Sequence, residues 1–291
     1  MFENMSQDLC IIGYPLAHSL SPIFHQAALD SLSLPIRYHS WPTSPEILSG
    51  KVAELREKNY LGANVTIPHK ETVGVYLDDL TPWAQTIGAV NTIIRDGANF
   101  IGHNTDAHGF IRSLKQIGRF NPKNKQVLLL GAGGAARAAA FGLAKEQISS
   151  LIIANRTGSK AQFLADDVSE HIPHVSTIDL TESHLEKACR DVNLIINSTS
   201  MGMRHSKTEQ LSPLTAKFIR PESLVCDMVY NPMETPLIVE ARKAGSRVLG
   251  GLPMLIYQGA DAFKHWTGKE APVEIMFSSA QKALTNLLHD E

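Results

Sequence analysis

The chain has 291 residues, of which 43% are hydrophobic and 19% are charged, and its formal net charge is −2. This length and hydrophobic content favour about two domains with substantial cores, and no basic block suggests nucleic-acid binding. No apolar segment reaches membrane-spanning length, and residues 1–10 lack the positive and apolar regions of a secretion signal. We therefore expect a cytoplasmic protein.

The cysteines and histidines show no metal-binding pattern. The three cysteines, Cys10, Cys189 and Cys226, form no C-x-x-C pair, and the 12 histidines form no H-E-x-x-H motif. We therefore expect no metal site. Cys10 and Cys226 lie in apolar segments, and we interpret both as small buried hydrophobic residues.

The first third of the chain alternates short apolar segments with helical patterns. Strands are predicted at residues 9–13, 36–41, 62–67 and 89–94, and helices from Ser21 onward and over residues 47–58. Pro22 suits the first position of the earlier helix, for which Ser21 is the expected cap. Strands that alternate with helices indicate a mostly parallel sheet with helical cover.

A helix over residues 106–117 and a polar loop lead into a second alternating segment. Its strands are predicted at residues 127–130, 151–154, 175–178, 194–197, 224–227 and 247–249. This is the pattern of a doubly wound, Rossmann-type unit. Two further helices, over residues 254–266 and 273–289, are too few to form a domain, so we expect them to pack on the first one. The sequence thus predicts an α/β protein with two domains, 1–105 plus 253–291, and 106–252.

A glycine turn lies at the start of this second domain. Residues 131–136 read GAGGAA, directly after an apolar strand and directly before an alanine-rich helix. In such a turn the helix N-terminus offers free N–H groups to a dinucleotide pyrophosphate. The expected contacts are Gly131, Ala132, Gly133, Gly134 and Ala135. The alternative is a glycine-rich turn that only packs tightly.

The end of the next strand distinguishes between nicotinamide cofactors, because NAD-binding proteins usually carry an acidic residue there. Here the strand ends in Asn155-Arg156-Thr157, with no carboxylate to repel a 2′-phosphate. Arg156 can pair with that phosphate through a planar, charge-assisted contact. Asn155 and Thr157 add neutral hydrogen-bonding groups, and Lys160 adds charge one turn later. The segment predicts NADP, unless Arg156 is only a solvated surface charge.

One polar cluster in the first domain lies where its first helix starts. Ser19 and Ser21 present two hydroxyls, two residues apart, beside the helix N-terminus. Together these groups can hold a small carboxylate without any arginine. The alternative is that Ser21 is only a helix cap.

A second polar cluster lies at the ends of predicted strands. Period-two alternation places Asn64 and Thr66 on one side of their strand, and Lys70 follows just after the next turn. Asn91 and Asp106 lie near the ends of later segments. Many fixed donors and acceptors suit a polyhydroxylated substrate. A lone lysine is usually a solvated charge, but a lysine beside an aspartate in a cleft can shuttle a proton.

These motifs resemble the shikimate dehydrogenase family over nearly the full length of the chain. The resemblance lies in GYPLAHSLSP (13–22), GANVTIPHK (62–70), GAVNT (88–92), NTDA (104–107), GAGGAARA (131–138), NRT (155–157), NSTSMG (197–202), DMVYNP (227–232) and GGLPMLIYQG (250–259). It implies an NADP-dependent oxidoreductase of aromatic amino-acid biosynthesis that reversibly reduces 3-dehydroshikimate to shikimate. It also implies a small-molecule substrate as partner, and it is compatible with a homodimer.

The resemblance further implies roles for individual residues. It assigns the shikimate carboxylate to Ser19 and Ser21, and it makes Lys70 and Asp106 the catalytic pair. The ring hydroxyls are assigned to Asn64, Thr66, Asn91, Asp106 and Gln258. The cofactor is assigned to Ser198, Thr199, Met201, Met228 and Gly251, with Tyr230 at the junction of cofactor and substrate.

The chain departs from the family pattern at three positions. His103 replaces a usual acidic residue, Ala107 a usual glycine, and Pro253 a frequent glycine. A histidine so close to Asp106 is expected to titrate near neutral pH. Two alternative functions stay open: a quinate/shikimate dehydrogenase with relaxed substrate or cofactor use, and a non-catalytic regulator that binds NADP or shikimate. Arg156 argues against a preference for NAD.

Overall fold

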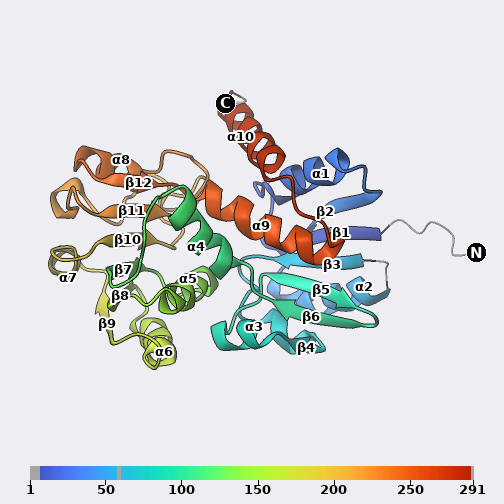
Figure 1. Cartoon of the computed structure of the whole chain (residues 1–291), viewed down its shortest axis with the longest axis horizontal. Coiled ribbons are helices and arrows are strands. Elements are labelled where there is room, and N and C mark those ends of the chain that lie inside the picture. The colour runs from blue at the N-terminus through green and yellow to red at the C-terminus, as the bar shows by residue number, and fades with distance from the viewer. Residues whose placement is uncertain (1–6, 58–59, 290–291) are drawn as a thin grey trace, which may run out of the picture. The chain divides into compact units, whose positions relative to one another are not determined.

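The structure, a computed structural model that describes residues 7–57 and 60–289, divides into two compact units (Figure 1). Unit 1 comprises Met1–Asp106 and Ile256–Glu291, and unit 2 comprises Ala107–Leu255. The boundaries expected from the sequence lie within three residues of these divisions. Among the described helices, none combines the length and apolar character that crossing a membrane requires.

Unit 1 is built on a six-stranded sheet in the order β2-β1-β3-β5-β6-β4. Its strands are β1 (Gln7–Gly13), β2 (Ile36–Pro42), β3 (Tyr60–Val65), β4 (Asp79–Leu80), β5 (Thr92–Asp96) and β6 (Asn99–His103). β1 pairs in parallel with β2 and β3, and β4 pairs in parallel with β6. The prediction of a mostly parallel sheet is confirmed. The sequence interpretation missed the antiparallel β5–β6 hairpin, which turns at Gly97 with a φ of 59°.

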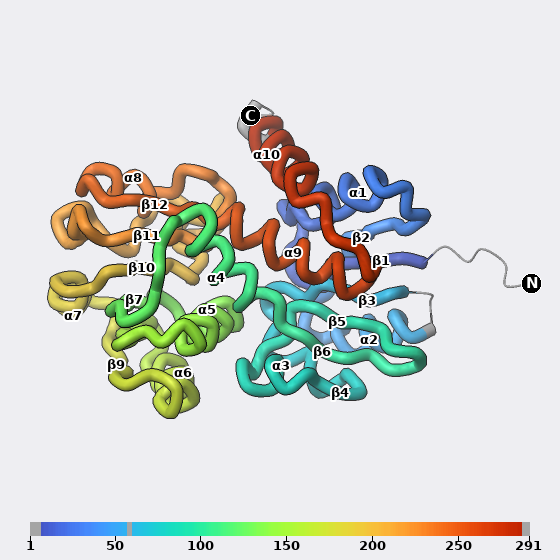
Figure 2. Tube along the Cα trace, in the orientation of Figure 1, coloured from blue at the N-terminus to red at the C-terminus, as the bar shows by residue number. Residues whose placement is uncertain are grey.

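The helices of unit 1 come from both ends of the chain. They are α1 (Ser21–Ser31), α2 (Leu48–Glu57), α3 (Pro82–Ile87), α10 (Val273–His289) and all but the start of α9 (Leu252–Thr267), with 3₁₀ turns at η1 (Pro45–Ile47) and η2 (Val73–Tyr76). α10 packs beside α1, the red and blue helices of Figure 2. On α9, the Trp266 indole donates to the Ile93 carbonyl at 2.9 Å. The expected packing of the last helices on the first domain is confirmed.

Apolar side chains at helical spacing attach α2 to the sheet of unit 1. Leu48, Val52 and Leu55 recur every three or four residues and are buried. They share one hydrophobic cluster with residues of β1 and β5, among them Ile12 and Ile93. Burial of such side chains stabilises the fold by roughly 1.5–3 kcal/mol each. This hydrophobic cluster also contains residues of β3, which carries Asn64, and of β5, which follows Asn91, two residues of the second polar cluster.

Unit 2 is a fully parallel six-stranded sheet in the order β12-β11-β10-β7-β8-β9. Its strands are β7 (Gln126–Leu130), β8 (Ser150–Asn155), β9 (His174–Asp179), β10 (Leu194–Asn197), β11 (Leu224–Asp227) and β12 (Arg247–Leu249). Its helices are α4 (Asp106–Gln116) after its first residue, α5 (Gly134–Lys145), α6 (Gly158–Val168), α7 (Glu182–Ala188) and α8 (Pro236–Lys243), with the 3₁₀ turn η3 (Ala216–Phe218). This is the Rossmann order, with its reversal between β7 and β10. The predicted doubly wound fold is confirmed.

Candidate active site

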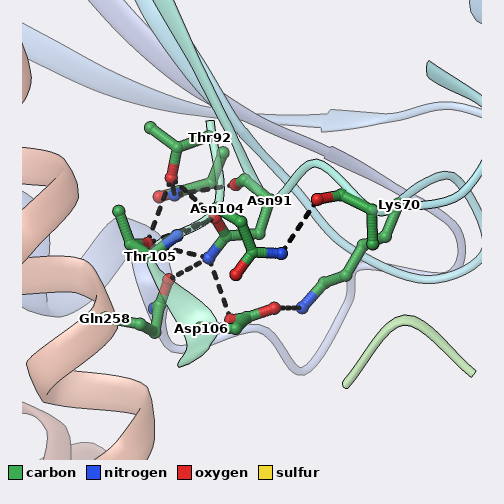
Figure 3. A network of polar contacts seen from close by, with 9 residues as sticks. Lys70, Asn91, Thr92, Asn104, Thr105, Asp106 and Gln258 are labelled. Atoms are coloured by element: carbon green, nitrogen blue, oxygen red, sulfur yellow. Dashed lines mark hydrogen bonds and ion pairs between the residues drawn. The ribbon is translucent and has the colours of Figure 1, made fainter. Parts of the chain in front are cut away.

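A lysine–aspartate pair lies at the centre of the polar residues of unit 1. Lys70 Nζ donates to Asp106 Oδ2 at 2.5 Å (Figure 3). The Asp106 side chain is 4% exposed and the Lys70 side chain 16%, so water screens this pair little. Asp106 starts α4, where the helix N-terminus favours its negative charge. The structure thus brings together the two residues expected to act as a catalytic pair.

Asn91 connects this pair to α9, to β5 and to the segment before α4. The two N–H groups of its Nδ2 face three acceptors, which are Asp106 Oδ1 and Thr105 Oγ1, both at 2.9 Å, and Gln258 Oε1 on α9 at 3.1 Å. Its Oδ1 accepts from the Thr105 backbone N–H at 2.8 Å and from Thr92 Oγ1 at 3.0 Å. Figure 3 shows these side chains converging on Asn91. Because one amide bonds so many neighbours, the network is fixed before a ligand arrives.

Asn64 and Thr66 mark the end of β3 in the same unit. Asn64 is buried, and its Nδ2 donates to the Asn91 carbonyl at 3.3 Å, which joins it to the network. Thr66 is half-buried beside Gly13, where an added Cβ would come within 2.3 Å of the Thr66 methyl. Glycine at position 13 therefore leaves room for Thr66 where β1 ends.

The two serines lie at the start of α1. Ser21 is the first residue of the helix and is buried, while Ser19 is half-buried and precedes it. The expected capping by Ser21 is wrong, because the cap position is Leu20 and carries no side-chain bond. Instead Ser19 Oγ accepts from the Ser21 backbone N–H at 3.4 Å. Since Ser21 does not cap, its hydroxyl is available for other contacts.

His103 does not behave as the sequence suggested. Its Nδ1 lies 3.0 Å from Thr81 Oγ1, and its ring packs edge-on against His265 at 4.5 Å. Burial, reinforced by His265 and opposed by Asp261, lowers the pKa of His103 to about 4. The expectation of titration near neutral pH is therefore wrong, because packing against α9 partly buries the ring and disfavours its charged form.

The glycine turn of unit 2 follows β7 as predicted. Gly131 has a φ of 108°, and an added Cβ would lie 2.5 Å from Ser198 Oγ and 3.3 Å from the Thr199 methyl. Only glycine fits this position, both in conformation and in space. α5 begins at Gly134, and its first intrahelical bond runs from Arg137 N–H to the Gly133 carbonyl. The turn and the segment after β10 therefore meet beside N–H groups able to receive an anion.

Asp227 organises the segments that follow β10 and β11. Its carboxylate accepts from Asn197 Nδ2 at 2.9 Å, the Val229 N–H at 3.0 Å and Thr235 Oγ1 at 2.5 Å. Asn197 Oδ1 in turn accepts from Thr199 Oγ1 at 2.7 Å. Burial raises the pKa of Asp227 to about 6, although these hydrogen bonds oppose the rise. Asp227 thus fixes the loops that carry the predicted residues Ser198, Thr199, Met201 and Met228.

The remaining predicted cofactor residues lie at two places in unit 2. Gly251 lies directly against the backbone that follows β11, since an added Cβ would lie 2.2 Å from the Met228 carbonyl. Arg156, Thr157 and Lys160 are exposed after β8. The Gly131 N–H donates to the Ala154 carbonyl at 2.8 Å, so the glycine turn is bonded to the strand that ends at this exposed cluster.

The structure separates the predicted residues into two groups. Unit 1 holds Ser19, Ser21, Asn64, Thr66, Lys70, Asn91, Asp106 and Gln258, whereas unit 2 holds the cofactor residues and Tyr230. The role of Tyr230 at a junction stays a prediction. The sequence interpretation did not single out Thr92, Thr105 or Tyr38. Thr92 and Thr105 lie within the GAVNT and NTDA motifs, but no local pattern marked their side chains. The contact of Tyr38 depends on strand register, which the sequence does not show. Within the described residues, no cluster of three His, Cys, Asp or Glu has the geometry of a metal site.

Comparison with known proteins connects both units to one family. Residues 11–93 match the family model of the shikimate dehydrogenase substrate binding domain, residues 113–230 that of shikimate / quinate 5-dehydrogenase, and residues 251–276 that of the shikimate 5′-dehydrogenase C-terminal domain. The shikimate dehydrogenase (NADP(+)) of Moorella thermoacetica is 42% identical over 95% of this chain and 93% of its own. The chain belongs to the shikimate dehydrogenase family.

Solved structures of family members superimpose on nearly the whole chain. A shikimate dehydrogenase in complex with NADP+ has a TM-score of 0.87 and 39% identity, and 98% of each chain is covered. The Thermus thermophilus enzyme in complex with NADP(H) and shikimate has a TM-score of 0.84 and 38% identity, with coverage of 95% of this chain and 99% of that one. The family resemblance inferred from the motifs is confirmed.

Proposed function

We propose that this protein is an NADP-dependent oxidoreductase that reversibly reduces 3-dehydroshikimate to shikimate. The observation that carries the proposal is the Lys70–Asp106 pair, held by Asn91 within a buried network of amides and hydroxyls. Such a network offers donors and acceptors in fixed positions to a polyhydroxylated ring. A regulator that only binds shikimate has no need of a lysine that an aspartate holds in position for proton transfer.

The residues of unit 2 fit NADP. Gly131, which has no room for a side chain beside Ser198, makes the tight turn that the dinucleotide fingerprint requires after the first strand. The N-terminus of α5 follows that turn and favours an anion. Arg156, Thr157 and Lys160 would hold the 2′-phosphate, and no acidic residue occupies position 155. When bound, the cofactor supplies hydride to the ketone carbon of the substrate.

Lys70 completes the reduction at the carbonyl oxygen. As negative charge develops on that oxygen, the ammonium group of Lys70 stabilises it and donates the proton that makes it a hydroxyl. Asp106 Oδ2 accepts one Lys70 hydrogen and so aims the ammonium group, while Asn91 fixes Asp106 through Oδ1. In the oxidation of shikimate, Lys70 takes the proton back. Ser19 and Ser21 hold the carboxylate, which orients the ring.

The deciding experiment is a spectrophotometric assay of NADP reduction by the purified protein. Shikimate and quinate are each offered with NADP and with NAD. Shikimate with NADP should give by far the highest kcat/KM of the four combinations. Comparable rates with quinate or NAD would indicate the relaxed dehydrogenase, and no turnover of either acid would indicate a binding regulator.

A cytoplasmic location and a homodimer are part of the same proposal. Cell fractionation tests the location. Light scattering of the purified protein tests the oligomeric state, and a mass near 31.9 kDa would show a monomer instead.

A further inference from the structure

One buried tyrosine of unit 1 lies beside two of the proposed substrate residues. Tyr38 lies on β2, and its phenol donates to Asn64 Oδ1 at 2.6 Å. The Ser21 side chain lies close enough to the same phenol to oppose the rise in its pKa that burial causes. One hydroxyl therefore bonds a residue assigned to a ring hydroxyl of the substrate and lies near a residue assigned to its carboxylate.

The hydrogen bond from Tyr38 determines which way the Asn64 amide points. The Asn64 Nδ2 group faces the Asn91 carbonyl at 3.3 Å and Thr92 Oγ1 at 3.5 Å. In the flipped orientation Oδ1 would face the Asn91 carbonyl, which places two acceptors together. Both N–H groups of the Asn64 amide are directed to neighbours, and Tyr38 uses one lone pair of Oδ1. The second lone pair of Oδ1 is therefore the hydrogen-bonding group of this amide that is left for a ligand. Asn64 is thus set to accept a hydrogen bond from a substrate hydroxyl.

A histidine holds the Tyr38 ring in place. His25 of α1 stacks on it with ring centroids 4.6 Å apart and an interplanar angle of 5°. His25 is fully buried, and burial lowers its pKa to about 3, so the ring is uncharged at neutral pH. Neither ring nitrogen makes a hydrogen bond of normal geometry to another described residue, although Asn64 lies near enough to oppose the pKa shift. His25 therefore acts on Tyr38 through packing.

Residues of α9 also pack against His25. A Cβ on Gly259 would lie 3.2 Å from His25 Nε2 and 2.6 Å from the Phe24 ring. Trp266 packs at 5.5 Å from the same imidazole. Because these contacts leave the stacked pair little room, the Tyr38 hydroxyl has one well-defined position.

We propose that Tyr38 is a positioning residue of the substrate site, whose hydroxyl orients Asn64 as a hydrogen-bond acceptor next to Ser21. The inference rests on the proposed function, which assigns Asn64 and Ser21 to the substrate. Tyr38 itself acts through Asn64, whereas Lys70 and Asp106 act on the reacting atoms. Its effect should therefore fall on substrate affinity.

The test is Tyr38→Phe, which removes the hydroxyl and keeps the stacked ring. We expect the KM for shikimate to rise about 10-fold, as loss of one buried hydrogen bond predicts, with kcat changed less than about 2-fold. The KM for NADP should stay unchanged. Tyr60→Phe is the matched control, because Tyr60 is equally buried in the same sheet but bonds Trp41 outside the network. Its KM for shikimate should equal that of the wild type.

A double-mutant cycle tests whether Tyr38 acts through Asn64. In an Asn64→Ala background, Tyr38→Phe should raise KM far less than it does alone, because the amide it orients is gone. An unchanged KM in Tyr38→Phe, or fully additive effects in the cycle, overturns the inference. If the wild type itself turns over no shikimate, the proposed function fails, and this inference fails with it. Normal wild-type turnover with an unchanged Tyr38→Phe variant refutes the positioning role alone.

Discussion

The two units prepare their ligand sites by different means. In unit 1 the proposed substrate residues are mostly buried side chains that bond one another around a neutral amide, Asn91. In unit 2 a buried carboxylate, Asp227, fixes the loops, but the proposed contacts are backbone groups at a glycine turn and exposed charges at Arg156 and Lys160. Buried side chains favour discrimination between similar polyols, whereas exposed charges recognise a phosphate that is common to many ligands.

The largest expected effect is at the chemical centre of unit 1. Lys70→Ala should lower kcat about 10²- to 10⁴-fold, the usual contribution of a general acid, with a much smaller change in the KM for shikimate. Steady-state kinetics measure both. Lys51→Ala is the control, since Lys51 is also a partly buried, ion-paired lysine of unit 1 and should leave kcat unchanged. Near-normal turnover of Lys70→Ala would show that Lys70 is not the general acid and that unit 1 supplies only binding.

The next effect tests the exposed charges of unit 2. Arg156→Ala should weaken NADPH binding about 10- to 100-fold, because it deletes a charge-assisted contact to the 2′-phosphate. NADH binding should be unaffected, since NADH lacks that group. Fluorescence titration with both cofactors measures the dissociation constants. Arg190→Ala, another exposed arginine of the unit, should change neither constant, and equal losses for both cofactors in Arg156→Ala would contradict 2′-phosphate recognition.

The buried carboxyl group of Asp227 in unit 2 should make the free energy of unfolding depend on pH. The pKa of Asp227 is raised to about 6 from its ordinary value of 3.8, so its proton is favoured in the folded state. Its contribution to stability is therefore present at low pH and lost as pH rises to about 6. Between pH 4.5 and 7.5, the free energy of unfolding of the wild type relative to Asp227→Asn should fall by about 2 kcal/mol. Urea unfolding at the two pH values measures this difference, and the exposed control Asp191→Asn should show none.

The smallest effect is expected at His103. With a pKa of about 4, His103 is uncharged throughout the range from pH 6 to 9. His103→Asn should therefore leave the shape of the kcat–pH profile unchanged over that range, with rates within about 2-fold of the wild type. A profile whose midpoint near neutral pH disappears in the variant would show that His103 titrates during turnover.

The sequence predicted those features that depend on local pattern. Buried strands such as β7 and β10 stand out as apolar segments, and the glycine turn at Gly131 is visible because its conformation excludes other residues. The β5–β6 hairpin was missed because the strand predicted over residues 89–94 overlaps β5, whereas β6 (Asn99–His103) has too few apolar residues to stand out as a strand. The Tyr38–Asn64 contact depends on the register of β2, β1 and β3, and one sequence carries no information about that register.

Burial was equally hard to predict for single side chains. His103 is three residues before Asp106, which suggested a group that titrates near neutral pH. Its pKa is set instead by packing against His265 of α9, more than 150 residues later in the chain. Long-range contacts of this kind follow from tertiary structure, so local spacing cannot reveal them.

The discontinuity of unit 1 has a consequence for the order in which the protein is made. During synthesis, unit 2 leaves the ribosome as one uninterrupted segment, Ala107–Leu255, and can close its sheet at once. The first sheet leaves the ribosome earlier but lacks Gln258, the Trp266 bond to Ile93 and the cover of α10 over α1 until the final helices arrive. The half of the molecule that is made first is thus the last to be finished.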